Sequence, residues 1–334
     1  MPAFATHEIF GQEGLEGILP EELFKAVEKH KAVFRIGCQG PDIFLYNPFF
    51  LLGKKQVNLG RRMHETRTGR FFQVYLQELL KVRDREKLEI GISYFLGFLS
   101  HYSLDCGLHP YIYGKSGYQE GKADSGVNTM PQHHRLEAVM DKLMLMAKRE
   151  CMPSSYYPEK RIQICGQELL ALAEIMSTTL QRVYRVFVKP RHIRMSYWWM
   201  KKVMKQVYDH TGRQKQQVCR FESLVWHRPV IGNMIVSDQL QDTWDVMNQR
   251  GEEWQSPWET DWTFDSSAWE LYDNAIERYQ IYVQAVQPVL SGMLKRMALL
   301  EKRQSRAAYV GDILQKWIPG CVSQLGNKNY HTGL

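Results

Sequence analysis

The stretch FLSHYSLDCGLHPYIY, residues 98–113, places His101, Asp105 and His109 four residues apart in otherwise apolar surroundings. An α-helix advances about 100° per residue, so the three side chains project from one stripe of a helix, one turn apart. The apolar neighbours predict that this stripe is buried. Two buried imidazoles and a carboxylate need compensation from one another, from water or from a metal ion. Taken alone, the stretch leaves a metal site and a hydrogen-bonded core cluster open.

The rest of the chain is also patterned for helices. Apolar residues recur mostly at helical spacing, and the long Val/Ile/Thr alternations typical of strands are missing. Helices are predicted over residues 20–34, 68–82, 86–109, 132–150, 165–187, 195–209 and 267–303. Proline disfavours helical geometry in the residue before it, so Pro110 predicts that the helix ends at His109.

Two segments are expected to lack regular structure. Residues 110–131 are rich in glycine and predict a loop, and residues 210–263 are irregular and rich in tryptophan. The sequence shows no internal repeat, low-complexity linker or clear domain boundary. We therefore expect one all-α domain over residues 1–318, with the metal-capable residues within 1–150 and a helical C-terminal part over 151–318. Residues 319–334 are expected to form a loosely ordered tail.

Bulk composition favours a soluble globular protein. The 334 residues are 44% hydrophobic and 24% charged. The sequence contains no run of about 18 apolar residues, so no membrane-spanning helix is predicted. The N-terminal stretch lacks a basic segment followed by an apolar one, so no secretory signal is predicted. A cytoplasmic location is therefore expected, with the six scattered cysteines as free thiols.

The net charge of +7 is unevenly distributed along the chain. Residues 189–220 hold nine Lys or Arg and one Asp, whereas residues 238–273 hold ten Asp or Glu and one Arg. The basic segment is also aromatic, which suits phosphate groups or an anionic membrane surface. The alternative is that the two segments pack near each other or are solvated helix faces.

Further imidazoles and carboxylates occur elsewhere in the first half of the chain. The stretch MPQHHRLEAVMD, residues 130–141, offers His133 and Glu137 four residues apart, with His134 and Asp141 as alternatives. Three other stretches contribute one candidate each: FATHEIF, GCQGPDIFLY and RRMHETRTGR. The set consists of imidazoles and carboxylates without a thiolate, and this combination is typical of catalytic zinc sites. It is large enough to bind two or three ions. The candidate ligands are His7, Asp42, His64, His101, Asp105, His109, His133 and Glu137.

The order of these residues, H…GPD…H…HxxxDxxxH…HxxxE over residues 7–137, resembles the zinc-dependent phospholipase C family. That family is related to secreted bacterial enzymes that hydrolyse phosphatidylcholine and, more distantly, to the S1/P1 nucleases. A weaker similarity covers residues 246–279. The resemblance implies a multi-helix bundle of the phospholipase C/P1 nuclease type, here with a helical C-terminal extension.

The resemblance also implies how the ligands are shared among metal ions. One zinc ion would be held by Asp42, His64, His101 and Asp105, and a second by His109, His133 and Glu137. A third would use His7, with Asp105 bridging it to the first. Secreted members complete this third position with an N-terminal tryptophan, whereas this chain begins Met-Pro-Ala. Two zinc ions are therefore expected, and the third position is left open.

The implied activity is hydrolysis of a phosphate ester, foremost the cleavage of a phospholipid by a metal-activated water as in phospholipase C. The products would be diacylglycerol and a phosphorylated headgroup, with Asp42 as the candidate general base. Two alternatives are a zinc phosphoesterase or nuclease with a non-lipid substrate, and a non-catalytic helical protein with structural zinc. The expected partner is the phosphate-ester substrate, with peripheral membrane contact as an option. No stable nucleic-acid partner is predicted, and the oligomeric state is open.

Overall fold

The computed structural model describes residues 4–48, 58–120, 125–225 and 231–334. Most of these residues are helical, and their only sheet is an antiparallel hairpin, which confirms the predicted all-α fold. The helices are α1 (Phe4–Leu15), α2 (Glu21–Lys29), α3 (Lys31–Gly37), α5 (Leu59–Glu65), α6 (Thr68–Lys81), α7 (Arg85–Lys115), α8 (Ser125–Arg149), α9 (Pro158–Arg161), α10 (Gly166–Tyr184), α11 (Pro190–Val207), α12 (Gln214–Val225), α13 (Ala268–Glu301) and α14 (Arg306–Leu325). The hairpin consists of β1 (Trp254–Ser256) and β2 (Glu259–Phe264), and a 3₁₀ turn, η1, spans Gly40–Phe44.

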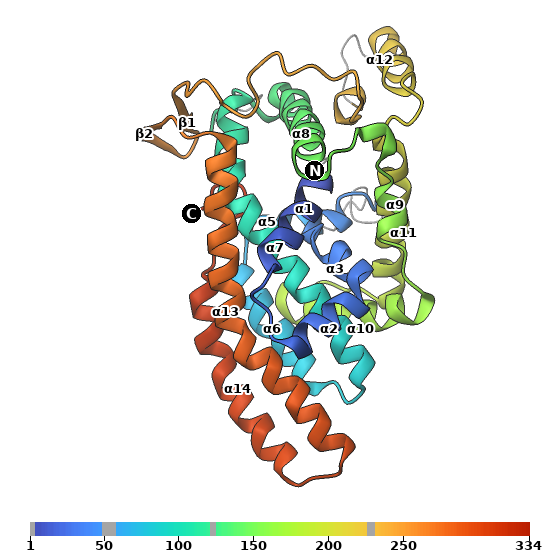
Figure 1. The fold of residues 1–334 in the computed structure, drawn as a ribbon, viewed down its shortest axis with the longest axis vertical. Helices are drawn as coiled ribbons and strands as arrows, with labels where there is room; N and C mark the ends of the chain where they lie inside the picture. Colours follow the sequence, from blue (N-terminus) through green and yellow to red (C-terminus); the bar gives the residue numbers. More distant parts are fainter. Residues whose placement is uncertain (1–3, 49–57, 121–124, 226–230) are drawn as a thin grey trace.

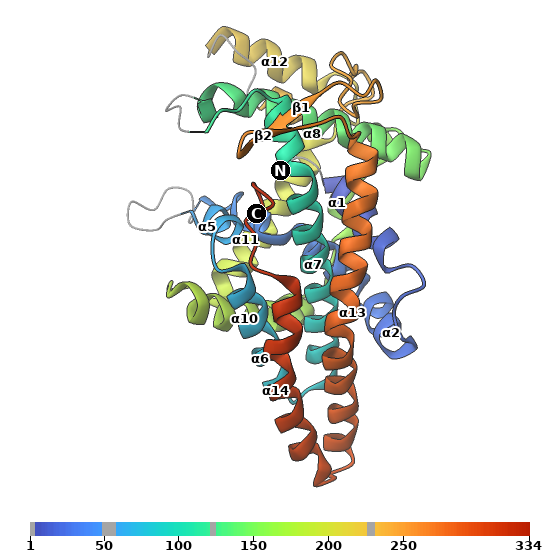
Figure 2. The same ribbon diagram turned by 90° about the vertical axis from the view of Figure 1, so that its left-hand side faces the viewer.

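Helix α7 is the central element of the fold. Its residues are apolar on nearly all sides, so most of them are buried against α3, α10 and α13. The helix begins at a cap in which the Asp84 carboxylate accepts a hydrogen bond from the Lys87 N–H at 2.7 Å. Helices α13 and α14 lie side by side and extend to one end of the molecule, while α8, α12 and the hairpin lie at the other (Figures 1 and 2).

The prediction that this helix ends at His109 is wrong, because α7 continues through Pro110 to Lys115. Proline removes one intrahelical hydrogen bond, which other contacts can outweigh. Tyr111 and Ile112 are 1% and 4% exposed, and the Tyr111 hydroxyl donates to the Val246 carbonyl at 2.7 Å. Burial of the residues after the proline therefore maintains the helix.

The segment expected to be a loop over residues 110–131 is also shorter than predicted. Helix α8 begins at Ser125, so helical residues occupy both ends of the segment. Residues 121–124 lie outside the described residues. Within the irregular segment 210–263, the structure adds α12 and the β1–β2 hairpin, while residues 226–230 are not described.

The C-terminal region differs most from expectation. Helix α14 was not predicted, and its last turns include residues 319–325 of the expected loose tail. The remaining residues turn at Gly326 and pack against α7, where Tyr330 is 1% exposed. The tail is therefore a folded part of the molecule. Its polar sequence concealed this because main-chain groups make many of its contacts.

Candidate metal centre

The predicted ligands converge on one buried region from five elements. Helix α7 carries three of them along its central stripe, α8 carries two, and α1, η1 and α5 carry one each. None is more than 8% exposed. Their ligand atoms form three groups in which all atoms lie within 4.8 Å of one another. The groups are His7, His101 and Asp105; Asp42, His64 and His101; and His109, His133 and Glu137.

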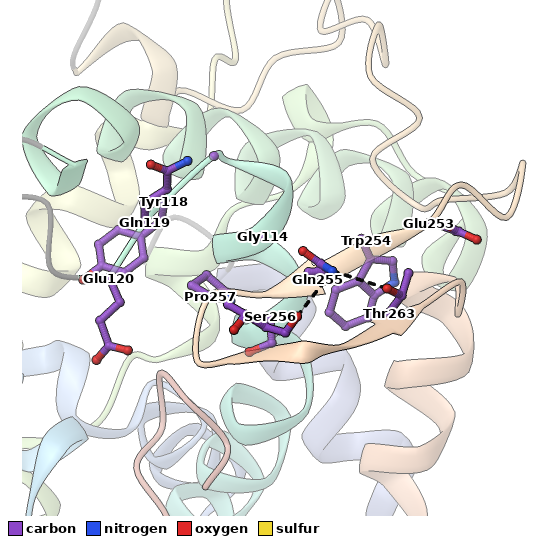
Figure 3. Close-up of a pocket in the computed structure, with 12 residues that line it drawn as sticks. Gly114, Tyr118, Gln119, Glu120, Glu253, Trp254, Gln255, Ser256, Pro257 and Thr263 are labelled. Atoms are coloured by element: carbon purple, nitrogen blue, oxygen red, sulfur yellow. Dashed lines mark hydrogen bonds between the residues drawn. The ribbon is translucent and has the colours of Figure 1, made fainter.

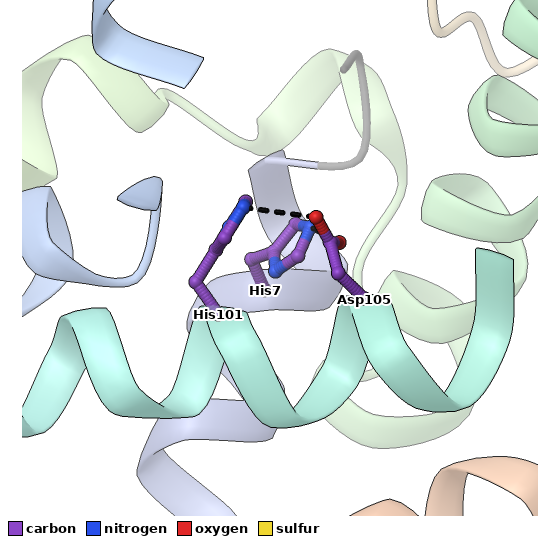
Figure 4. Close-up of side chains that lie close together, drawn as sticks. All are labelled: His7, His101 and Asp105. Atoms are coloured by element: carbon purple, nitrogen blue, oxygen red, sulfur yellow. Dashed lines mark ion pairs between the residues drawn. The ribbon is translucent and has the colours of Figure 1, made fainter. Parts of the chain in front are cut away.

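Asp105 is the carboxylate on which the histidines converge. Its Oδ2 lies 3.0 Å from Nε2 of His101 and 3.5 Å from Nε2 of His64, and its Oδ1 lies 3.3 Å from Nε2 of His7. Figure 4 shows His101 and Asp105 rising from the same helix, with the His7 ring next to the carboxylate. Burial alone would raise the pKa of Asp105, but neighbouring His101 and His109 outweigh it and hold the pKa well below its usual range. Asp105 therefore stays ionised in the protein interior.

Asp42 reaches the same region from the η1 turn. Gly40 has φ +49°, and a Cβ there would lie 2.2 Å from the His101 ring, so only glycine permits this approach. Asp42 Oδ1 lies 3.2 Å from Nε2 of His64. Burial lowers the pKa of His64, but the nearby carboxylates of Asp105 and Asp42 dominate and raise the pKa to about 10. The two carboxylates therefore favour a positive charge at this position.

Backbone carbonyls fix the orientation of three ligand histidines. The Nδ1 atoms of His64, His101 and His109 lie 2.8, 3.1 and 3.0 Å from the carbonyl oxygens of Gly60, Cys38 and Tyr330, respectively. A carbonyl only accepts hydrogen bonds, so each Nδ1 carries a proton, and each ring can offer an Nε2 lone pair to a metal ion once Nε2 is deprotonated. This arrangement is the one in which histidines bind metal ions.

The third group joins α7 to α8. His133 and Glu137 are one turn apart on α8, with His133 Nε2 3.1 Å from Glu137 Oε1. His109 Nε2 lies 3.8 Å from the same oxygen. Burial raises the pKa of Glu137, but nearby positive charge, including that of His133, and hydrogen bonds from His109 and His133 hold it well below its usual range. Two imidazoles thus face one ionised carboxylate.

These residues fit a zinc centre. Several buried polar atoms of the ligand side chains make no hydrogen bond, namely Nδ1 of His7, Oδ1 of Asp42, Nε2 of His101, Oδ2 of Asp105 and Nδ1 of His133. Leaving one such group unsatisfied costs about 1–3 kcal/mol, so a concentration of them indicates an additional partner. Imidazole and carboxylate donors without thiolate suit zinc.

The alternative ligands on α8 lie outside the three groups. His134 is one residue from His133, and burial lowers its pKa to about 4. Asp141 instead accepts hydrogen bonds from the Thr6 N–H at 2.8 Å, the Thr6 hydroxyl at 2.6 Å and the Tyr208 hydroxyl at 2.6 Å. It thereby holds the first turn of α1, which carries His7. Asp141 is therefore a positioning residue for α1 and not a proposed ligand.

His133→Ala should lower zinc binding and hydrolysis by more than about 100-fold, because it removes a proposed ligand rather than a supporting group. His134→Ala should change both by less than about tenfold. Zinc content and turnover measured on the two purified variants test this. The reverse ranking would shift the ligand assignment on α8 by one residue.

Aromatic side chains connect the third group to a neighbouring cavity. The Tyr113 ring lies 4.6 Å from the His133 ring and 5.2 Å from that of Trp258 (centroid distances). Tyr118 contacts Tyr113 and also lines a cavity of about 640 Å³ between the end of α7 and the β1–β2 hairpin (Figure 3). The hairpin therefore contributes to the surroundings of the metal centre.

Sequence reasoning missed the contribution of the C-terminus to this site. The Tyr330 carbonyl accepts the hydrogen bond from His109, and the His331 ring stacks on that of His64 at a centroid distance of 5.2 Å. The stretch GNKNYHTGL contains no apolar periodicity that would have placed it near a buried site. His331 was the one residue in this stretch whose type could have indicated a place near a metal centre.

A buried set of histidines and carboxylates, held on helices and free of thiolate, is typical of catalytic zinc sites. The family model described as zinc dependent phospholipase C matches residues 6–209, a range that includes every predicted ligand. The chain belongs to the zinc-dependent phospholipase C family. A search of curated proteins and a search of solved structures each found no match. The weaker resemblance over residues 246–279 lies outside the matched range and stays a prediction.

Proposed function

We propose that this chain is a zinc-dependent phospholipase C that hydrolyses the phosphodiester bond of a phospholipid. Family membership supports phospholipid hydrolysis as the class of reaction. The observation that carries the proposal is the convergence of four histidines on the single buried carboxylate of Asp105. A carboxylate surrounded in this way is suited to be shared between metal ions.

The proposed ligand sets combine the three groups with the family resemblance. Asp42, His64 and His101 form one group, to which the resemblance adds Asp105, and these four would hold one zinc ion. His109, His133 and Glu137 would hold a second. His7 would contribute to a third position shared with Asp105, whose completion by the N-terminus falls on residues 1–3, outside the described residues. When bound, such ions neutralise phosphoryl oxygens and lower the pKa of a water molecule towards about 7.

Asp42 is the proposed proton acceptor. Its Oδ1 is buried and makes no hydrogen bond, and the pKa of Asp42 is held low because His64 outweighs the effect of burial. In the proposed reaction, Asp42 accepts a proton from the water that attacks phosphorus. The bond between phosphorus and the glycerol oxygen would break, and the departing alkoxide would take up a proton from the surrounding water. The products are diacylglycerol and a phosphorylated headgroup.

A basic aromatic face on α11 supports contact with an anionic membrane. The helix contains no acidic residue, and its exposed positions include Arg191, Arg194, Trp198, Lys202 and Lys205. None of these cations forms an ion pair within the described part of the chain. The Lys202 Nζ lies 5.0 Å from the centre of the Trp198 ring. We call these five residues the α11 face.

The alternative, that residues 189–220 and 238–273 pack near each other or are solvated helix faces, holds, among the described residues, only at one point of contact. Gln216 donates to the Gln239 side chain at 2.9 Å, and Gln239 donates to the Gly212 carbonyl at 3.3 Å. In the described ranges, no ion pair joins the two segments.

Helix α11 is linked to the proposed site through Asn47, whose side chain donates to the hydroxyl of the buried Ser196 at 2.8 Å. Asn47 follows the η1 turn that carries Asp42. No described helix is long and apolar enough to cross a membrane.

Lys202→Glu should weaken binding to vesicles of phosphatidylserine and phosphatidylcholine by at least about tenfold. Each basic residue near an anionic membrane contributes about 1 kcal/mol, and this substitution reverses a charge. Co-sedimentation with vesicles at low and physiological salt measures the effect. The matched control is Lys316→Glu beside the exposed Trp317 on α14, which should bind as wild type. Equal binding of both variants would contradict the proposed face.

The experiment that tests the proposed function is zinc-restored hydrolysis after chelation, with three substrates in parallel. The substrates are phosphatidylcholine vesicles, single-stranded DNA and a generic phosphomonoester. We expect zinc-dependent release of diacylglycerol from the vesicles. Cleavage of another substrate with the lipid intact would reassign the substrate, and zinc binding without turnover would indicate a structural ion.

A further inference from the structure

Residues 327–334, here called the C-terminal strap, contact ligand histidines from two groups of the proposed metal centre. The Tyr330 N–H donates to the carbonyl oxygen of His64 at 2.9 Å. The carbonyl oxygen of Tyr330 accepts from His109 Nδ1 at 3.0 Å. His64 belongs to the group with Asp42, whereas His109 belongs to the group on α8. One buried residue of the strap therefore holds a histidine of each group.

The next residue extends this contact. The His331 ring lies parallel to that of His64, with an interplanar angle of 14° and a centroid distance of 5.2 Å. It lies 5.5 Å from the His109 ring, and its Nδ1 is 3.3 Å from the Tyr113 hydroxyl. His331 thus occupies the space between the two ligand histidines, although it belongs to none of the three ligand groups.

The strap is fastened to the body of the fold by hydrogen bonds. The Tyr102 hydroxyl accepts from the Lys328 N–H at 3.1 Å, and the Thr68 hydroxyl donates to the Lys328 carbonyl at 3.0 Å. The Gly69 N–H donates to Asn327 Oδ1 at 2.9 Å. These contacts hold residues 327 and 328 against α6 and α7, just before the residues that contact the ligand histidines.

Asn329 organises the turn that follows. Its Oδ1 accepts from the N–H of His331 at 2.8 Å and from that of Thr332 at 3.4 Å, and its carbonyl accepts from the Gly333 N–H at 2.9 Å. Gly333 has φ +71°, and a Cβ there would lie 2.6 Å from the Cys106 carbonyl oxygen on α7. The turn therefore requires glycine at 333 both for its backbone conformation and for its close approach to α7.

We propose that the C-terminal strap completes the metal centre by fixing His64 and His109 in the orientation that binds zinc. The Tyr330 carbonyl selects the tautomer of His109 in which Nε2 is free for a metal ion. His331 restricts the rotation of the neighbouring rings. The inference rests on the proposed zinc centre but not on the identity of the substrate. Loss of such supporting partners typically weakens metal binding by about 10–100-fold.

The first test is Gly333→Ala, which should push the strap away from α7 because backbone meets the added methyl group. Zinc affinity, measured by competition with a coloured chelator, should fall by about 10–100-fold. The visible spectrum of the cobalt(II)-substituted protein should change as well, since it reports ligand geometry. Gly320→Ala on α14 is the matched control, because the same substitution there adds a methyl group with nothing within 4 Å, and both measurements should remain as in wild type.

A second pair of variants covers the case in which Gly333→Ala disturbs folding. Asn329→Ala removes the acceptor that closes the turn, whereas Asn329→Asp keeps an oxygen in the same place. We expect Asn329→Ala to bind zinc about 10-fold more weakly or worse, and Asn329→Asp to restore most of the affinity. Melting curves of the metal-free proteins should be alike, which separates positioning of ligands from general destabilisation.

Two results would overturn the proposal. Wild-type zinc affinity and cobalt spectra in both Gly333→Ala and Asn329→Ala would show that the strap does not position ligands. Faster hydrolysis with unchanged zinc affinity would show that the strap obstructs the site instead. Absence of zinc binding by the wild-type protein would be a different failure, because it would contradict the proposed function itself.

Discussion

Asp105→Asn is expected to lose bound zinc and to lower hydrolysis by more than about 100-fold, beyond the loss typical of supporting residues. Asn keeps the size of the side chain but removes its charge and replaces one acceptor oxygen by an NH₂ donor. That donor would face the Nε2 atoms of His101 and His64, which lie 3.0 and 3.5 Å from Asp105 Oδ2, or that of His7, 3.3 Å from Oδ1. The substitution therefore affects two proposed metal positions at once.

This expectation is tested by elemental analysis of zinc in the purified variant and by its rate of hydrolysis with added zinc. Asp312→Asn on α14 is the control, because the same chemical change there falls on an exposed side chain far along the sequence from the site. It should retain wild-type zinc content and activity. Full zinc content in Asp105→Asn would refute the ligand assignment built around this carboxylate.

Much of the candidate site could be predicted because its ligands obey local spacing. His101, Asp105 and His109 share a stripe of α7, and His133 and Glu137 share one of α8, so each helix presents its ligands together. What spacing cannot supply is how separate elements meet. The convergence of His7 and Asp42 on α7 could be inferred only from the resemblance to a family, and Asp141 became a positioning residue only once α1 was seen against α8.

The errors in the fold prediction have one physical origin. The expected end of α7 at Pro110 and the expected loose tail both relied on local signals. In each case, tertiary contacts decide the outcome: Tyr111 is buried beyond the proline, and Tyr330 is buried beyond the last helix. Contacts made by main-chain groups, such as the Tyr330 carbonyl with His109, leave no trace in residue type. They are invisible to periodicity and to motif spacing alike.

Removal of zinc is expected to destabilise the protein as well as to inactivate it. Asp42, Asp105 and Glu137 are buried carboxylates with depressed pKa values, and a metal ion that binds only the folded state stabilises it by mass action. At free zinc about 1,000-fold above the Kd, the stabilisation is about 4 kcal/mol. With roughly 2 °C per kcal/mol for a chain of this size, chelation should lower Tm by about 8 °C.

The decisive comparison is the same chelation experiment on Asp105→Asn. If the stabilisation comes from zinc at this centre, the variant has lost the zinc that Asp105 binds but keeps the group of His109, His133 and Glu137, so chelator should lower its Tm by clearly less than it lowers that of the wild type. Readdition of zinc should restore each protein to its Tm before chelation. A chelator effect of equal size in both proteins would locate the stabilising ion elsewhere. A Tm that chelation does not change in the wild type would contradict a zinc ion bound among these carboxylates, because the ion could not leave the folded state without a loss of stability.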